Sequence, residues 1–125
     1  VPIAGKQSGV YVVPQIGAGV WIEFEQGDPD YPIWVGGYWG TAAELPVLAL
    51  AGNPASPSIV LQSGLQNTIS ISDMAGPAGG ILLQSLTGAF IAINEVGITI
   101  SNGQGAIVVL TGPTVTINDG ALVVT

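Results

Sequence analysis

The chain of 125 residues contains no cysteine, no histidine and no arginine, and its one basic residue is Lys6. Without cysteine it can form neither a disulfide framework nor a thiolate zinc site. Without histidine the ordinary Ser-His-Asp triad is excluded, although serines are scattered through the chain. Eight acidic residues bring the formal net charge to -7, and contacts to nucleic-acid phosphates or anionic lipids need Lys and Arg. We therefore expect no nucleic-acid partner.

Charge of either sign is scarce. Only 7% of residues are charged, whereas 48% are hydrophobic and the mean hydropathy is +0.61. A soluble domain typically carries about 25% charged residues. Gly, Asn, Ser and Pro interrupt every apolar run before it reaches the roughly 18 residues of a membrane span. The surplus apolar surface is therefore predicted to be buried between subunits rather than in lipid.

Residues 59–125 carry short apolar couplets, in which two aliphatic residues are separated by one position, with Gly, Asn, Asp or Pro in most of the gaps. Period-2 alternation of β-branched residues predicts strands with one buried face. Glycine and asparagine tolerate the positive φ that tight corners require. The couplets are Ile69 and Ile71, Ile81 and Leu83, Ile91 and Ile93, Ile98 and Ile100, Ile107 and Val109, Val115 and Ile117, and Leu122 and Val124.

One copy of this tail would leave its apolar face and its strand edges open. Three copies wound together would bury every couplet on a common axis and would pair the edges between chains. We therefore interpret the tail as a trimeric rod whose core is made by the fourteen couplet residues. The longest gap, residues 73–80, is predicted to bulge as a surface loop.

Residues 1–43 have a different pattern and contain all three tryptophans. Turn-forming residues separate three predicted strands, at residues 10–13, 20–24 and 32–38. Gly36-Gly37 is expected either to end the third strand or to introduce a bulge. Strands joined by hairpins, with no helical period, indicate part of a small barrel.

Residues 44–58 are predicted to be a linker. Pro46, Pro54 and Pro57 forbid a continuous helix or a central strand there. Residues 47–51 are predicted to form one apolar turn or a short strand. Because the composition changes from aromatic to aliphatic in this segment, we place the domain boundary near Gly52, which divides the chain into residues 1–43, 44–58 and 59–125.

The densest acidic cluster consists of Glu23, Glu25, Asp28 and Asp30. Such a cluster could hold Ca²⁺ or supply a carboxylate pair for acid–base chemistry. The spacing is not that of a known calcium loop, so we favour a hairpin turn with solvated charges. We predict no metal site and no cofactor.

Four aromatic residues, Trp21, Trp34, Tyr38 and Trp39, could stack on sugars or bases. Base stacking would lack its basic partners, so we favour packing at the barrel surface or against a neighbouring subunit. Two Gly-x-Gly segments lack the following helix of a dinucleotide-binding fingerprint. We find no catalytic constellation and predict that the chain is not an enzyme.

The segment from Gly9 to Gly36 reads GVYVVPQIGAGVWIEFEQGDPDYPIWVG. It resembles the OB-fold signature of the phage baseplate assembly protein V family, which includes the spike hubs of contractile phage tails, of type VI secretion and of extracellular contractile injection systems. The signature positions in this chain are Pro14, Gly17, Val20, Phe24, Gly27, Asp28, Pro29, Pro32 and Gly36.

This resemblance implies an all-β chain, with a partial OB-fold barrel followed by a trimeric triple-stranded β-helix. It implies a homotrimeric structural spike, in a phage tail baseplate or a phage-like particle, that pierces a cell envelope when the sheath contracts. The implied partners are a baseplate hub protein at the OB end, a PAAR-type tip protein at the C-terminal end and, transiently, the target cell envelope.

The chain departs from the family pattern in two ways. Family OB domains begin with further strands before the position of Val1, so we expect the barrel to be incomplete. Some members end in a tip where histidines hold an iron ion, and this chain has no histidine.

Two other functions stay open: an OB-fold module that binds a carbohydrate or peptide through Trp34 and Trp39, and a spike whose enzymatic domain lies outside this sequence. The sequence does not distinguish a phage from a tailocin or a secretion machine.

Overall fold

The computed structural model describes residues 3–125. The chain divides into two compact units, Val1–Leu45 and Pro46–Thr125, and the regular secondary structure of both is mainly β-strand, as predicted. The boundary expected near Gly52 falls inside the second unit, because α1 (Val47–Leu50), a single apolar turn, contacts β5 (Ile59–Gln62) of the sheet that follows. No helix in residues 3–125 has the length and hydrophobicity that crossing a membrane requires.

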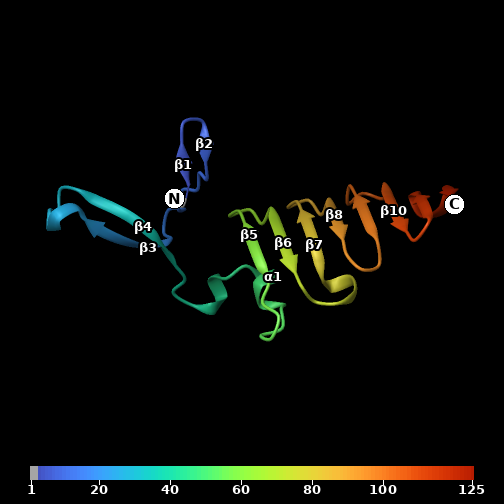
Figure 1. Cartoon of the computed structure of the whole chain (residues 1–125), viewed down its shortest axis with the longest axis horizontal. Helices are drawn as coiled ribbons and strands as arrows, with labels where there is room; N and C mark the ends of the chain where they lie inside the picture. Colours follow the sequence, from blue (N-terminus) through green and yellow to red (C-terminus); the bar gives the residue numbers. More distant parts are fainter. Residues whose placement is uncertain (1–2) are drawn as a thin grey trace. The chain divides into compact units, whose positions relative to one another are not determined.

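The first unit contains two separate antiparallel pairs (Figure 1). They are β1 (Ala4–Gly5) with β2 (Ser8–Gly9), and β3 (Gly19–Phe24) with β4 (Pro32–Tyr38). The prediction of a strand at residues 10–13 is wrong, because within residues 3–125 no second strand pairs with this segment. Its first residue, Val10, donates its N–H to the carbonyl oxygen of Ile3 at 3.0 Å.

The β3–β4 hairpin is closed by the turn at residues 25–31. Its short 3₁₀ segment η1 (Glu25–Gly27) has positive φ at Gln26 and Gly27, and the Asp28 carboxylate accepts the N–H of Asp30 at 3.0 Å. The register of the β3–β4 ladder shifts by one residue between the Trp21–Gly36 pair and the next pair, Ile22–Trp34. The bulge predicted as one alternative at Gly36-Gly37 therefore lies beside Gly36, since Val35 has no partner in the ladder.

The second unit is an eight-stranded sheet whose strands follow one another in chain order, each antiparallel to its neighbours. Figure 1 shows them stacked along the length of the unit. The strands are β5 (Ile59–Gln62), β6 (Thr68–Ser72), β7 (Gly80–Gln84), β8 (Phe90–Ile93), β9 (Ile98–Ser101), β10 (Ile107–Thr111), β11 (Thr114–Ile117) and β12 (Leu122–Val124).

This connectivity corrects one expectation from the sequence. The strands were expected to leave their edges open for pairing between chains, but β6 to β11 are hydrogen-bonded on both sides within one chain. Connections of two to seven residues return the chain at once to a neighbouring antiparallel position. Only β5 and β12 therefore present a free edge of this sheet.

Successive connections lie at opposite long edges of the sheet, because every strand reverses direction. We call one edge the turn edge, which carries residues 63–67, 85–89, 102–106 and 118–121. The other is the loop edge, which carries residues 73–79, 94–97 and 112–113. The Asn67 side chain accepts the N–H of Leu86 at 3.1 Å along the turn edge. Along the loop edge, Glu95 accepts the N–H of Gly76 at 2.9 Å.

A dry core is missing from the single chain. No hydrophobic side chain in residues 3–125 is buried, and the most buried side chains of that range are Thr68 and Ser70, at 7% and 9% exposure. Hydrophobic burial is the main term that offsets the conformational entropy of folding. The sheet therefore has its hydrogen bonds but lacks most of the hydrophobic stabilisation that would hold it.

Two glycines at sheet corners permit a matched test of the fold. Gly80 and Gly88 have similar positive φ values of 82° and 91°. A Cβ at Gly80 would overlap the carbonyl oxygen of Ile93, whereas a Cβ at Gly88 would meet nothing within 4 Å. We expect Gly88→Ala to cost about 1–2 kcal/mol through its backbone conformation alone. Gly80→Ala should cost about 1–3 kcal/mol more, since the strands must move apart.

The measurement is guanidinium unfolding of both variants at one fixed protein concentration, because midpoints of oligomers depend on concentration. Equal losses of unfolding free energy would show that β7 and β8 do not approach at Gly80 as described.

Candidate subunit interface

The strand register assigns each side chain of the second unit to one face of the sheet. Directly opposed residues in an antiparallel pair share a face, and so do residues two apart along a strand. The ladder runs from Ile59–Ile71 to Ile71–Ile81 and continues through β12. It places sixteen side chains together on what we call the aliphatic face: Ile59, Leu61, Ile69, Ile71, Ile81, Leu83, Ile91, Ile93, Ile98, Ile100, Val108, Leu110, Val115, Ile117, Leu122 and Val124.

Twelve of the fourteen predicted couplet residues lie on this face, but Ile107 and Val109 do not. Val108 stands opposite Ile100 and Leu110 stands opposite Ile98, whereas Ile107 pairs with Ser101 and Val109 with Thr99. The sequence interpretation that placed the Ile107/Val109 couplet with the other six is therefore wrong. Strand β10 is apolar at four consecutive positions, so alternation alone did not decide which pair belongs with the others.

The turns that precede the strands contain a sequence signal that identifies the residues of β10 on the aliphatic face. Three turns of the turn edge have five residues and close through the same hydrogen bond from the first N–H to the last carbonyl, at Ser63–Asn67, Ser85–Ala89 and Asn102–Ala106. In the first two turns the residue two positions after the turn, Ile69 or Ile91, is on the aliphatic face. The same offset from Ala106 gives Val108.

The aliphatic face is uncovered in the single chain. Its exposed members range from 36% at Ile91 to 64% at Leu61. Burying the remaining surface of such side chains is worth on the order of 1 kcal/mol each, and collectively on the order of 10 kcal/mol per chain. An uncovered strip of this size is typical of a protein–protein interface.

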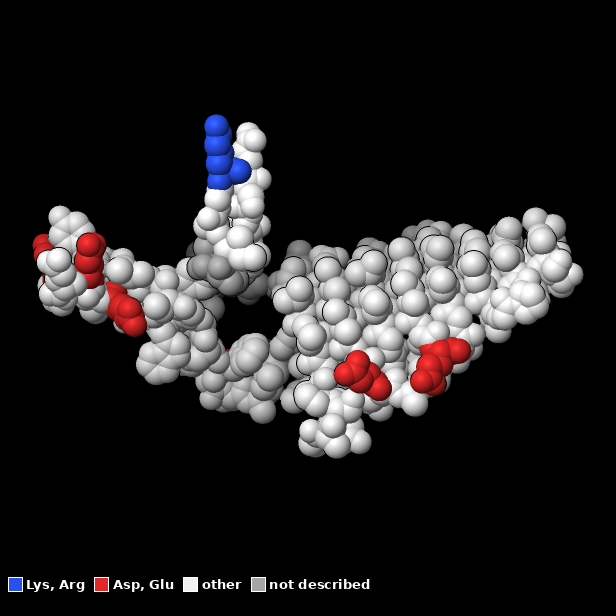
Figure 2. All heavy atoms as spheres, viewed as in Figure 1, with Lys and Arg blue, Asp and Glu red and all other residues white. Residues whose placement is uncertain are grey.

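Charged side chains are absent from the aliphatic face. The second unit contains three acidic residues, Asp73, Glu95 and Asp119, and each lies in a connection between strands. Figure 2 shows acidic groups along one long edge of this unit, the edge on which Figure 1 shows the connection between β6 and β7. Copies of the aliphatic face can therefore meet without bringing charges into a dry contact.

The opposite face is richer in hydroxyl groups and is partly covered by its own chain. Strand β6 presents Thr68, Ser70 and Ser72 there. The Thr68 hydroxyl donates to the carbonyl oxygen of Gln66, in the turn just before β6, at 3.1 Å. Helix α1 and the connection at residues 73–79 line a pocket of about 280 Å³ above this face. We call this the hydroxyl face. The segment predicted as a surface loop, residues 73–80, therefore covers part of the hydroxyl face.

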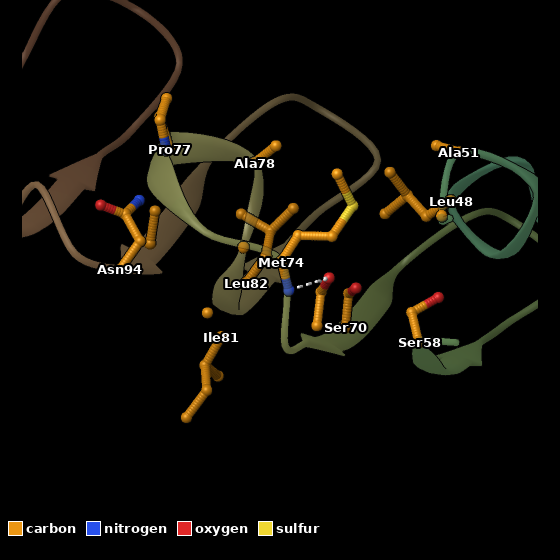
Figure 3. Close-up of a pocket in the computed structure, with 15 residues that line it drawn as sticks. Leu48, Ala51, Ser58, Ser70, Met74, Pro77, Ala78, Ile81, Leu82 and Asn94 are labelled. Atoms are coloured by element: carbon orange, nitrogen blue, oxygen red, sulfur yellow. Dashed lines mark hydrogen bonds between the residues drawn. The ribbon is translucent and has the colours of Figure 1, made fainter. Parts of the chain in front are cut away.

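Side chains around this pocket come from the cover and from the sheet. Figure 3 shows Leu48 and Met74 turned toward one another beside Leu82, while Ile81 points away. The hydroxyl oxygen of Ser58 is buried here without a hydrogen-bond partner. The chain therefore covers its hydroxyl face in part and leaves the aliphatic face to other molecules.

The signature residues of the first unit gather around the β3–β4 hairpin. Phe24 pairs with Pro32 at one end of the hairpin, and Gly36 lies at the bulge. Gly27 supplies a positive φ in the turn that Asp28 stabilises, and Pro29 follows it. Val20 lies on β3, while Pro14 and Gly17 lie in the irregular segment that leads into that strand.

The acidic cluster and the aromatic residues of this unit are separate features. Asp28 is engaged in the turn, and no group of three potential metal-binding residues occurs in the described part of the chain. Trp34, Tyr38 and Trp39 line an open hollow of about 830 Å³. Trp21 packs against Tyr38 with ring centroids 5.3 Å apart. The Glu44 carboxylate on the hollow accepts the N–H of Gly40 at 2.7 Å.

Comparisons with known proteins match both units. Residues 58–123, more than half of the chain, match the family described as the phage baseplate V C-terminal trimerisation domain. Residues 1–39 match the type VI secretion system/phage-baseplate injector OB domain. No curated protein and no solved structure matched the chain. The uncovered aliphatic face requires a partner surface, and the first of these descriptions indicates that the association is trimeric.

Two adjacent valines of β10 test the face assignment. Val108 lies on the aliphatic face and Val109 on the opposite one. Val108→Asp should abolish trimer formation, because it would bring three carboxylates into one dry contact at several kcal/mol per ion. Val109→Asp should leave the trimer assembled and cost about 1–3 kcal/mol, because Val109 is half-buried on the opposite face.

Sedimentation velocity of the two variants measures the difference. If Val109→Asp were the variant that lost the trimer, the register of β10 would be shifted by one residue and the sequence interpretation restored.

Proposed function

The chain belongs to the phage baseplate V family and is a structural component of a baseplate or injector, and from this premise we propose that it is a homotrimeric spike that pierces a cell envelope mechanically. One observation carries the proposal. The segment that matches a trimerisation domain is a sheet whose six inner strands are paired on both sides within the chain and whose aliphatic face is uncharged and uncovered.

Three copies would place their aliphatic faces on a common axis, with each sheet as one side of a shaft. Eight strands stacked about 4.8 Å apart make a shaft roughly 35 Å long. The right-handed twist of each sheet would wind the three chains around one another. The shaft would differ from the triple-stranded β-helix expected from the family in one respect, because its strands pair within each chain rather than between chains. The core residues proposed for this shaft are the sixteen of the aliphatic face.

Such a shaft suits a mechanical role. Its backbone hydrogen bonds lie within each chain and its apolar contacts lie between chains, so opening any part would break both at once. Regions that open at low free energy are those with few apolar contacts and exposed hydrogen bonds. A long unfolding half-life, rather than equilibrium stability alone, is what a spike under load needs.

The partners follow from the two ends of the chain. The unit with the OB signature would contact a baseplate hub protein, and the free edge of β12 would meet a PAAR-type tip protein. The chain would act in the tail baseplate of a virion or of a phage-like particle, without enzymatic activity of its own. Contact with the target envelope would last only as long as sheath contraction.

Particles that carry substituted spikes test the mechanical role. Ile100 lies on the aliphatic face and its neighbour Thr99 on the other. Ile100→Asp should prevent trimerisation and abolish cell entry or killing. Thr99→Asp should keep trimerisation and killing well above those of Ile100→Asp, since residue 99 is half-buried on the opposite face and its carboxylate would not meet its copies on the axis. The measurements are sedimentation of the purified chain and killing titre per assembled particle.

Normal titres from particles whose Ile100→Asp spike stays monomeric would refute piercing by this chain. A trimer that assembles normally with Ile100→Asp would refute the axial position of residue 100.

A second candidate function rests on the hollow of the first unit. Trp34 and Trp39 both line it, and exposed aromatic rings beside a carboxylate are the groups with which proteins hold neutral sugars. If the unit binds saccharides, Trp34→Ala with Trp39→Ala should abolish retention on immobilised envelope polysaccharide. Tyr11→Ala, at an exposed side chain that does not line the hollow, is the control. Unchanged retention in the double variant would exclude this function.

A further inference from the structure

Two exposed leucines of the sheet are not explained by the aliphatic face. Leu65 and Leu86 lie in connections of the turn edge, with exposed fractions of 69% and 58%. The turns that carry them are coupled, because Asn67 in the first accepts the N–H of Leu86 in the second at 3.1 Å. The turn edge therefore holds two apolar side chains on neighbouring, mutually fixed corners.

The loop edge carries a pocket that could receive an apolar side chain such as those leucines. The pocket of about 280 Å³ is lined there by Met74, Pro77 and Asn94, together with Leu48 and Leu82. Figure 3 shows Leu48, Met74 and Leu82 around one space. The Ser58 hydroxyl in this pocket has no partner. An apolar side chain flanked by backbone polar groups, as at a turn, suits these walls.

We propose that Leu86, supported by Leu65, from each protomer packs into the Leu48–Met74–Leu82 pocket of the next protomer. This inference rests on the proposed trimer. Three equivalent sheets around one axis form a cyclic assembly, in which contacts are head-to-tail rather than between identical patches. The turn edge of each sheet then meets the loop edge of the next.

Leu86 and the pocket lie at the same level along the axis of the proposed trimer. Leu86 lies in the connection between β7 and β8, and the pocket is lined by Ser70 of β6, Leu82 of β7 and Ala92 of β8. Rotation about an axis leaves the position along that axis unchanged. With the strands stacked along the axis, Leu86 of one protomer therefore arrives at the level of its neighbour's pocket.

Charge favours the same pairing of edges. Asp73 and Glu95 lie on the loop edge, whereas the turn edge has one acidic residue, Asp119 in its last turn, and none in the turns at residues 63–67, 85–89 and 102–106. Two loop edges brought together would place like charges side by side at a cost. A turn edge packed against a loop edge avoids that repulsion. The acidic residues therefore disfavour the arrangement in which two loop edges meet.

Disulfide trapping tests the contact, and the chain has no native cysteine to complicate it. The variant is Leu86→Cys with Met74→Cys. The two positions lie at opposite edges of one chain, separated by the five residues of β7, about 17 Å at the rise of a strand. A disulfide requires Cα atoms within about 7 Å, so any bridge must join two protomers.

On mild oxidation we expect the monomer band on a non-reducing denaturing gel to be replaced by covalent dimer and trimer. Each single substitution alone should stay monomeric on the gel, since the contact is head-to-tail. Leu86→Cys with Val123→Cys is the matched control, because β12 lies four strands beyond β8, about 19 Å along the stack. It should not form covalent trimers.

The outcomes separate this inference from the proposed function. A chain that sediments as a trimer but yields no covalent trimer overturns the Leu86 contact and leaves the spike proposal standing. Covalent dimers from either single variant overturn the head-to-tail arrangement. A wild-type chain that sediments as a monomer overturns the proposed spike itself.

Discussion

The aliphatic face of the second unit is the constraint on which the rest of this protein depends. Sixteen Ile, Leu and Val side chains share one side of a single-layer sheet, and no hydrophobic side chain in residues 3–125 is buried. Protein layers are stable when each apolar face packs against another. Here the chain places its own cover, α1 and residues 73–79, on the hydroxyl face. Association between chains is therefore a condition of stability.

Hydrogen bonding and hydrophobic burial are divided between two levels of structure. The strands satisfy one another's backbone groups within the chain, so no protomer needs a neighbour's strand to complete its ladder. Apolar packing is left to the assembly. This division explains how a chain with 7% charged residues and 48% hydrophobic residues can have a regular fold and still lack a core. It also means that charge on the aliphatic face acts on assembly first.

Much of this organisation could be predicted from the sequence. Alternation at couplets such as Ile69 and Ile71 predicted the strands, and the Gly and Asn positions predicted the corners, because both depend on local conformational preference. The predicted strand at residues 10–13 failed, since an isolated apolar run has no ladder without a partner strand. The OB signature residues around Gly27 and Asp28 were identified as a group because they shape one local turn.

The sequence by itself determined the all-β class, the corners, the need for association and the resemblance to the baseplate V family. Only the tertiary structure decided which residues of β10 belong to the aliphatic face. In β10, four consecutive apolar residues permit two assignments, and the pairing of Val108 with Ile100 selects one of them. Likewise, no local pattern shows that Leu48 and Met74 cover the hydroxyl face. Alternation separates the two sides of a strand, but register and packing, which join distant residues, decide what each side meets.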